Sequence, residues 1–187
     1  SSRRRKAQSE VDKQAEDLGE RAFKAFPGYR GKPGVWGNMS ALVLDESRLS
    51  ALLIVDGFAK ELSFDDILSA QIVTDGVSVT SSQKSGTFGR VVTGGLIAGG
   101  AGAIIGAITA KSVQKTVSST TSIDLVVETS DPQFPLLSWN FFSPNGLMQD
   151  IKSYEMWIYI EPAVEAYNVL APAFTTRATE ENGLVEI

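Results

Sequence analysis

An uncharged stretch, residues 91–110, restricts the fold of this chain more than any other feature, because Arg90 and Lys111 bound it and no charge interrupts it. At about 20 residues it is long enough for one helix across a lipid bilayer. On a helix its small residues form two adjacent stripes, each repeating at every fourth position. The first stripe is Gly94, Ala98, Gly102, Gly106 and Ala110, and the second is Gly95, Gly99, Ala103 and Ala107.

This pattern is a glycine zipper. Small side chains at every fourth position allow a second helix to approach until the two backbones touch, as helices do in lipid. In water each glycine costs a helix about 1 kcal/mol relative to alanine, so a bilayer or neighbouring copies must supply the stability. A mobile Gly/Ala linker is the alternative, but linkers do not carry aliphatic residues such as Leu96, Ile97, Ile104 and Ile105. We therefore predict that the small residues mediate oligomerisation or membrane association.

The composition excludes several classes of function. The chain has 187 residues with no histidine and no cysteine. It therefore lacks disulfides, thiolate nucleophiles, the usual zinc ligands and every catalytic triad that depends on imidazole. A net charge of -5 argues against a general nucleic-acid surface. We expect no cofactor, no metal site and no nucleic-acid partner.

The remaining polar motifs do not form a catalytic site. The stretch from Ser82 to Lys84 lacks the spacing of a Ser-Lys dyad, and no Lys-Ser/Thr pair follows the glycines in the way a phosphate loop requires. Paired carboxylates are usually solvated turn residues, and one pair is better explained by helix capping. The pairs are Asp45/Glu46, Asp65/Asp66, Glu161/Glu165 and Glu180/Glu181. We predict a protein that is not an enzyme and has no catalytic residues.

The first part of the chain, residues 1–26, has the spacing of an amphipathic helix with a basic beginning. Cations at a helix N-terminus oppose the macrodipole, so a helix that continues upstream is one explanation. In that case the cations would lie on the membrane surface beside an apolar helix; a solvated basic end is the alternative. These cations are Arg3, Arg4, Arg5 and Lys6. Tyr29 and Trp36 are further candidates for a membrane interface.

Seven short strands are predicted after this helix, and the first five read as an antiparallel meander. They cover residues 36–44, 48–55, 58–62, 69–74, 77–81, 122–129 and 136–142. Two Asp-Gly pairs, at Asp56 and Asp75, are strong hairpin signals, and residues 63–66 predict one helical turn that carries Ile67 and Leu68. A helix follows Ser143-Pro144, and Pro162 either kinks it or opens a second helix.

This order of elements resembles the pleckstrin-homology (PH) superfold, in which an amphipathic helix closes one end of a bent antiparallel sheet. The Phe64-Asp65-Asp66-Ile67 element resembles bacterial and GRAM-like versions. The resemblance covers about residues 36–170 without the zipper and implies an α+β fold with a seven-strand PH-like sheet or barrel. Phosphoinositide binding is not carried over, because the loop that the family uses for it reads Asp45-Glu46-Ser47 and would repel a polyphosphate. The whole also resembles small bacterial or phage-encoded proteins with a Gly/Ala-rich apolar insert.

The predicted organisation has five parts. A basic helix occupies residues 1–26, the first part of the β-domain residues 35–82, the zipper insert residues 83–121, the last strands and C-terminal helix residues 122–172, and an acidic tail residues 173–187. About 20 residues make one bilayer crossing. The insert is therefore either a short hairpin that turns near Gly99-Gly100 or one crossing that separates the first five strands from the last two. The second arrangement exposes unpaired strand edges and is disfavoured.

The sequence thus predicts a non-enzymatic, membrane-associated homo-oligomer, a scaffold or a pore-like assembly, with its PH-like domain in the cytoplasm. Its expected partners are other copies of itself and membrane lipid. The alternative is a soluble binding module whose insert docks on a partner protein or an apolar ligand. Aromatic residues of the last strand and helix are interpreted as core, namely Trp139, Phe141, Phe142 and Trp157.

Overall fold

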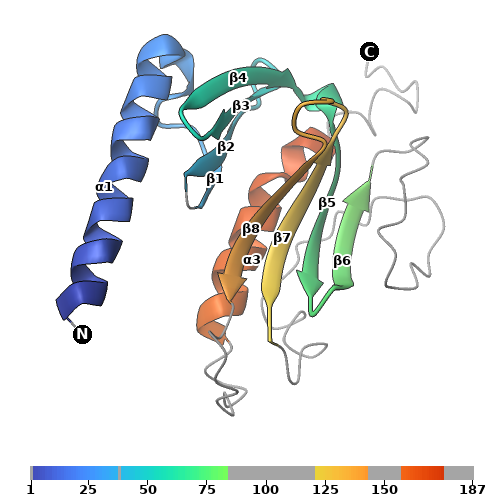
Figure 1. Cartoon of the computed structure of the whole chain (residues 1–187). Coiled ribbons are helices and arrows are strands. Elements are labelled where there is room, and N and C mark those ends of the chain that lie inside the picture. Colours follow the sequence, from blue (N-terminus) through green and yellow to red (C-terminus); the bar gives the residue numbers. More distant parts are fainter. Residues whose placement is uncertain (1, 38, 84–120, 143–156, 175–187) are drawn as a thin grey trace, which may run out of the picture. The chain divides into compact units, whose positions relative to one another are not determined.

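The computed structural model describes residues 2–37, 39–83, 121–142 and 157–174 (Figure 1). The chain forms two compact units, residues 1–64 and residues 65–187. Each unit contains a four-stranded antiparallel sheet, with strand order β1-β2-β3-β4 in the first and β6-β5-β7-β8 in the second. The prediction of an α+β fold built on antiparallel strands is confirmed.

The first unit begins with a long helix, over the residues where the sequence predicts one, and continues as a meander. A single 3-10 turn, with Pro27 at its first position, follows the helix and leads to the sheet. The elements are α1 (Ser2–Ala25), η1 (Pro27–Tyr29), β1 (Gly34–Gly37), β2 (Ser40–Asp45), β3 (Ser50–Val55) and β4 (Phe58–Ser63).

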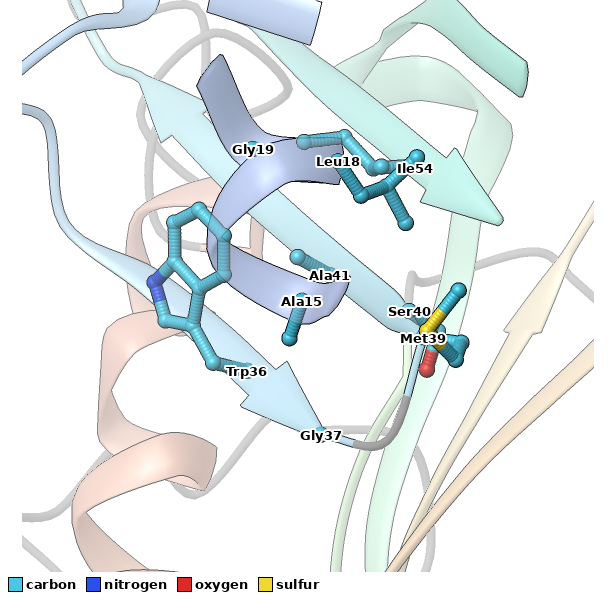
Figure 2. Close-up of a pocket in the computed structure, with 9 residues that line it drawn as sticks. All are labelled: Ala15, Leu18, Gly19, Trp36, Gly37, Met39, Ser40, Ala41 and Ile54. Carbon is cyan, nitrogen blue, oxygen red and sulfur yellow. The ribbon is translucent and has the colours of Figure 1, made fainter. Parts of the chain in front are cut away.

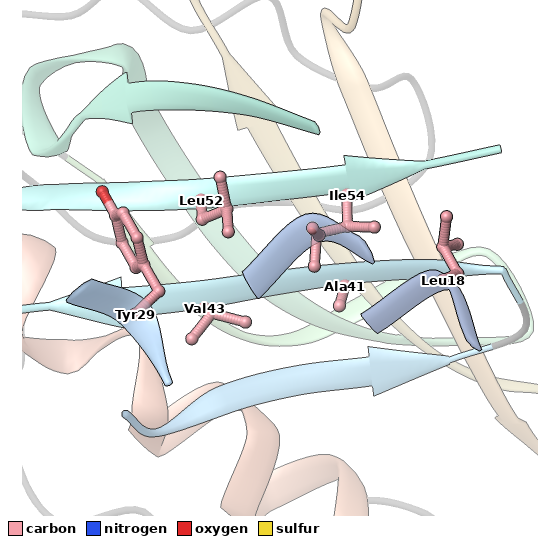
Figure 3. Packing of buried hydrophobic residues seen from close by; sticks show 7 residues of the cluster. Leu18, Tyr29, Ala41, Val43, Leu52 and Ile54 are labelled. Atoms are coloured by element: carbon pink, nitrogen blue, oxygen red, sulfur yellow. The ribbon is translucent and has the colours of Figure 1, made fainter. Parts of the chain in front are cut away.

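A hydrophobic cluster holds α1 and η1 on one face of this sheet (Figure 3). Helix α1 contributes side chains from one stripe, because positions four apart share a helix face. Strands β2 and β3 contribute alternate residues, which lie on one face of a strand. The buried members are Leu18, Ala22, Tyr29, Ala41, Val43, Leu52 and Ile54. The amphipathic spacing of the sequence thus becomes the contact between the helix and the sheet.

The second unit contains the other sheet and its covering helix. Its elements are β5 (Ile67–Thr74), β6 (Val77–Gln83), β7 (Ile123–Thr129), β8 (Leu136–Phe142) and α3 (Trp157–Val169), and η2 (Phe64–Asp66) precedes β5. Helix α3 packs against β5, β7 and β8 (Figure 1). Ile160, Ala163, Val164 and Tyr167 of α3 are buried. Pro162 lies inside α3 and is exposed, so the helix runs through it rather than starting anew there.

Both Asp-Gly pairs form the predicted hairpin turns. Asp56 and Gly57 have positive φ values of 44° and 88°, and Asp75 and Gly76 have values of 51° and 78°. Two consecutive residues with positive φ match the right-handed twist of the flanking strands. These turns connect β3 to β4 and β5 to β6, and they are the most accurate local predictions from the sequence.

The predicted first strand is wrong, since residues 36–44 are divided by a tight turn between β1 and β2. Gly37 pairs with Ser40, and Met39 has a φ of 56° in the left-handed region. The described residues therefore contain eight strands instead of seven. A polar Gly37-Asn38 dipeptide is the signal that the sequence offered for this turn.

The predicted five-strand meander is also wrong. Strand β5 pairs with β6 and β7, so it starts a second sheet instead of extending the first. The helical turn predicted to carry Ile67 and Leu68 ends earlier, because η2 covers Phe64–Asp66 and both residues belong to β5. Local patterns indicated each strand correctly here but could not specify its partner, which is a long-range choice.

The strands on either side of the insert lie in the same sheet, which contradicts one of the two predicted insert geometries. β6 and β7 both pair with β5, on its opposite sides. The single crossing that separates the first five strands from the last two is therefore wrong. Gln83 at the end of β6 pairs with Ser69, whereas Ile123 at the start of β7 pairs with Thr74. At about 3.4 Å per residue the insert leaves and rejoins the sheet at opposite ends, about 17 Å apart along β5.

Candidate functional site

The predicted site residues fall into two groups. The nine zipper residues, Gly94, Gly95, Ala98, Gly99, Gly102, Ala103, Gly106, Ala107 and Ala110, lie outside the described residues. Arg3, Arg4, Arg5 and Lys6 lie in the first turns of α1. Among the described residues, no helix is long and apolar enough to cross a membrane.

A groove lies between α1 and the edge strand β1 in the first unit. It has a volume of about 910 Å³. Trp36 of β1 is 49% exposed and meets Phe23 of α1 edge to face, with ring centroids 5.8 Å apart. Glu16, Glu20, Lys24 and Arg30 add charges of both signs. The sequence indicated Trp36 as an exposed aromatic but gave no sign of the groove.

Beneath this groove the helix and the sheet are closely packed. A cavity of about 10 Å³ lies between Ala15 and Gly19 of α1 and the β1–β2 turn (Figure 2). This is about the space of one water molecule, so the cavity cannot hold a ligand. A Cβ atom at Gly19 would lie 3.6 Å from the Trp36 ring, an ordinary contact. An alanine would therefore also fit against the indole at this position.

A polar network joins η1 to β3 and β4 at one end of the first sheet. The Tyr29 hydroxyl lies 2.7 Å from Ser50 Oγ and donates to Glu61 Oε1 at 2.7 Å. Ser50 Oγ also donates to Glu61 Oε1 at 3.1 Å. The Arg48 guanidinium lies over the Tyr29 ring, 4.5 Å from its centroid, which is cation–π geometry. The network fixes η1 to the sheet through polar contacts.

The ionisation of this network favours its hydrogen-bonded form. Burial raises the pKa of Tyr29 to about 12, with the bond to Ser50 acting in the opposite direction and Glu61 raising it further. Hydrogen bonds from Tyr29 and Ser50 lower the pKa of Glu61. A neutral tyrosine therefore faces a charged carboxylate at neutral pH. This arrangement anchors η1 to β3 and β4.

The turn between β2 and β3 is organised around Asp45, whose side chain is nearly buried. Its carboxylate accepts hydrogen bonds from Ser47 N at 3.1 Å and Arg48 Nε at 2.7 Å, and Lys32 Nζ lies 3.2 Å away. The Ser47 hydroxyl and the Arg48 guanidinium both donate to this carboxylate and lower the pKa of Asp45. Because β1 and β2 are separate strands, this is the second hairpin loop rather than the first. The identification of Asp45-Glu46-Ser47 as the first hairpin loop, on which the argument against phosphoinositide binding rested, is therefore wrong. Lys32 and Arg48 are both paired with Asp45.

The aromatic predictions are partly correct. Trp139 and Phe142 are buried, and Phe142 stacks at a tilt on Tyr159 of α3 at 4.7 Å, so they belong to the core as expected. Tyr29 is fully buried, so the interpretation of this residue as part of a membrane interface is wrong. The described residues contain no group of three or more acidic side chains arranged to hold a metal ion.

A comparison with protein families gives one match, to a family described as "glycine zipper containing PH domain", over residues 34–143. The match covers more than half of the chain. The chain belongs to this family. Residue 34 is the first residue of β1 and residue 143 directly follows β8, so the matched PH domain includes both sheets. Neither curated proteins nor solved structures give a match.

Membership in the glycine zipper PH family confirms the resemblance predicted from the sequence. All nine predicted zipper residues lie within the matched range. A PH domain that contains a glycine zipper indicates a binding or association module. Helices α1 and α3 lie outside the matched range.

Proposed function

We propose that this protein is a non-enzymatic, membrane-associated homo-oligomer that assembles through the glycine zipper of its PH domain, as a scaffold or a pore-like assembly. The observation that carries the proposal is the family match, because it joins the PH domain and a glycine zipper in one range, residues 34–143. Two overlapping stripes of small residues let helices of neighbouring copies pack with their backbones in contact. Assembly would supply the stability that a glycine-rich helix lacks in water.

The position of the insert supports a particular arrangement of this assembly. Since β6 and β7 belong to one sheet, the chain leaves and rejoins the same unit. A membrane insert between them has to enter and leave the bilayer on one side. A helical hairpin that turns near Gly99-Gly100 meets this requirement. In this arrangement the PH domain remains on the cytoplasmic side, and the cations from Arg3 to Lys6 lie on the anionic membrane surface.

The proposal is tested with the purified full chain and a variant in which residues 91–110 are replaced by a Gly/Ser linker. Both are mixed with liposomes and separated by flotation, and the mass of each is measured in detergent. We expect the full chain to float and to form a defined oligomer, and the variant to remain at the bottom as a monomer with unchanged strand content by circular dichroism.

The same experiment contains the outcome that favours the alternative function. A full chain that stays out of the liposome fraction and is a monomer would contradict the proposal. It would instead support a soluble PH-domain module whose insert docks on a protein partner. A chain that floats as a monomer would contradict the assembly and leave only a membrane anchor.

A further inference from the structure

Among the residues that the structure describes, strand β1 has no partner on the edge beside the groove and α1. It is the first strand of its sheet and pairs, within the described part of the chain, with β2 alone. Leu44 N donates to Pro33 O at 2.9 Å, so Pro33 and Leu44 form a hydrogen-bonded pair. Hydrogen-bonded and non-hydrogen-bonded residue pairs alternate along an antiparallel ladder. Val35 and Gly37 therefore bond to β2, whereas Gly34 and Trp36 direct their backbone N–H and C=O groups outward. An exposed edge of this kind is a template for one more strand.

The groove also offers an apolar contact next to that edge. Trp36 pairs with Ala41, which belongs to the cluster under α1, so the indole lies on the side of the sheet that faces the helix. It is half-exposed, and Phe23 supports it from α1. An aliphatic or aromatic side chain from an added strand would pack on Trp36. An amphipathic surface with one exposed indole is typical of a binding hot spot.

The charges along the groove are ordered and give the occupant a direction. Glu16 and Glu20 precede Lys24 along one face of α1, and Arg30 follows. All of these side chains are exposed, and none takes part in the ion pairs found among the described residues. Gly37, the last residue of β1, lines the small cavity together with Ala15 and Gly19, which are the sequence neighbours of Glu16 and Glu20. The C-terminal end of β1 therefore lies at the acidic end of the groove, and β1 runs opposite to α1. A strand added antiparallel to β1 runs from the acidic end to the basic end.

We propose that the groove between α1 and β1 binds an extended peptide segment of a partner protein, which adds to β1 as an antiparallel strand. The segment has a basic side chain near Glu16 and Glu20, an apolar side chain on Trp36 and an acidic side chain near Lys24 and Arg30. Backbone pairing supplies much of the affinity, and the charges fix the direction. This binding is independent of assembly through the zipper.

The test uses the full chain and two synthetic peptides of the same composition. One peptide has lysines at its N-terminal end, valines and an isoleucine in the centre, and glutamates at its C-terminal end; the other has the charges exchanged. Binding is measured by fluorescence anisotropy. The first peptide should bind at least about tenfold more tightly, because every rim charge changes from attraction to repulsion in the second.

A charge-reversed protein makes the test independent of folding defects. The variant carries Glu16→Lys, Glu20→Lys, Lys24→Glu and Arg30→Glu, all at exposed positions. It should prefer the second peptide by a similar factor. The matched control, Asp17→Lys with Arg21→Glu, changes exposed charges of α1 that do not line the groove and should keep the original preference. Absence of peptide binding, or a preference that the reversal does not change, would overturn the proposal.

Amide hydrogen exchange identifies the pairing edge. On addition of the first peptide, the amides of Gly34 and Trp36 should exchange at least about tenfold more slowly, while that of Val35, already bonded to β2, should change little. If the amides of Gly34 and Trp36 already exchange slowly without peptide, and more slowly at higher protein concentration, a second copy occupies this edge. Protection by detergent or lipid alone would show an apolar small-molecule site. Either result contradicts a peptide site.

Discussion

Tyr29 belongs to both the hydrophobic cluster and the polar network of the first unit. Its ring belongs to the hydrophobic cluster, and its hydroxyl joins Ser50 and Glu61. The sequence could not predict this network, since its members are separated by 21 and 32 positions and only the pairing of β3 with β4 brings Ser50 and Glu61 together. A tyrosine after Pro27-Gly28 suggested an exposed interface residue, and the fold buries it instead.

The Tyr29→Phe substitution should destabilise the protein by about 1 kcal/mol, because it removes the hydroxyl and leaves Ser50 and Glu61 with one fewer partner. The measurement is the midpoint of urea unfolding at neutral pH. The folded-state pKa of Tyr29, about 12, lies above the ordinary value of 10, so its contribution is complete below pH 10 and is lost as the pH rises from 10 to 12. The variant should lose less stability over that interval. Equal midpoints for both proteins at neutral pH would contradict the role of the network.

At the scale of elements, two glycines mark close contacts of β1, Gly19 where α1 meets Trp36 and Gly34 where β1 meets β2. Gly19 lies in the middle of α1, where a Cβ atom would make ordinary contacts with the Trp36 ring. Gly34 lies in β1, where a Cβ atom would come within 3.1 Å of Leu42 O and 3.2 Å of Val43 Cα. The first position has space for a methyl group, whereas the second is closed by backbone atoms.

The Gly19→Ala substitution should therefore stabilise the protein by about 0.5–1 kcal/mol through helix propensity. Gly34→Ala should destabilise it by about 1–3 kcal/mol, since backbone atoms of β2 must move to admit the methyl group. Both are measured as shifts of the thermal unfolding midpoint, and each serves as the control for the other. A shift of the same sign in both variants would contradict the described packing at Gly19 and Gly34.

The elements differ in how far the sequence predicted them. The alternation of apolar and polar residues predicted β7 accurately. Ile123, Leu125 and Val127 are buried, and Asp124 and Glu128 are partly exposed. The Asp-Gly turns were equally clear, because positive φ at two consecutive residues has few sequence solutions. The β1–β2 turn was missed because Met39 is not a residue type that usually adopts positive φ. The groove was missed because an edge strand is recognised only when its neighbours are known.

At the scale of the whole molecule, the arrangement of strands around the insert matters most. The family match places the zipper inside a PH domain, and the pairing of β5 with both β6 and β7 closes that domain on each side of the insert. The sequence predicted the zipper and the resemblance but not the distribution of strands into two sheets, since strand partners depend on contacts between distant segments.

Side-specific labelling tests this topology. The chain has no cysteine, so Ser78→Cys in β6 and Gln133→Cys between β7 and β8 each give a single reactive site. Protein is added to preformed vesicles and treated with a maleimide that does not cross membranes. Both sites should react to the same extent before and after the vesicles are opened. Reaction of one site only after opening would show that the insert crosses the bilayer once, and that the two strands lie on opposite sides.

The most direct measurement of the central claim is the mass of the full chain in detergent, determined by light scattering for Gly102→Leu, Gly106→Leu and the unchanged protein. Ile104→Leu, on the opposite face of the predicted helix, is the matched control. We predict that leucine in a glycine stripe reduces a defined oligomer to monomers, because helix backbones can no longer approach, and that the control keeps the oligomer. An oligomer of the same mass in all four proteins would contradict assembly through the glycine zipper.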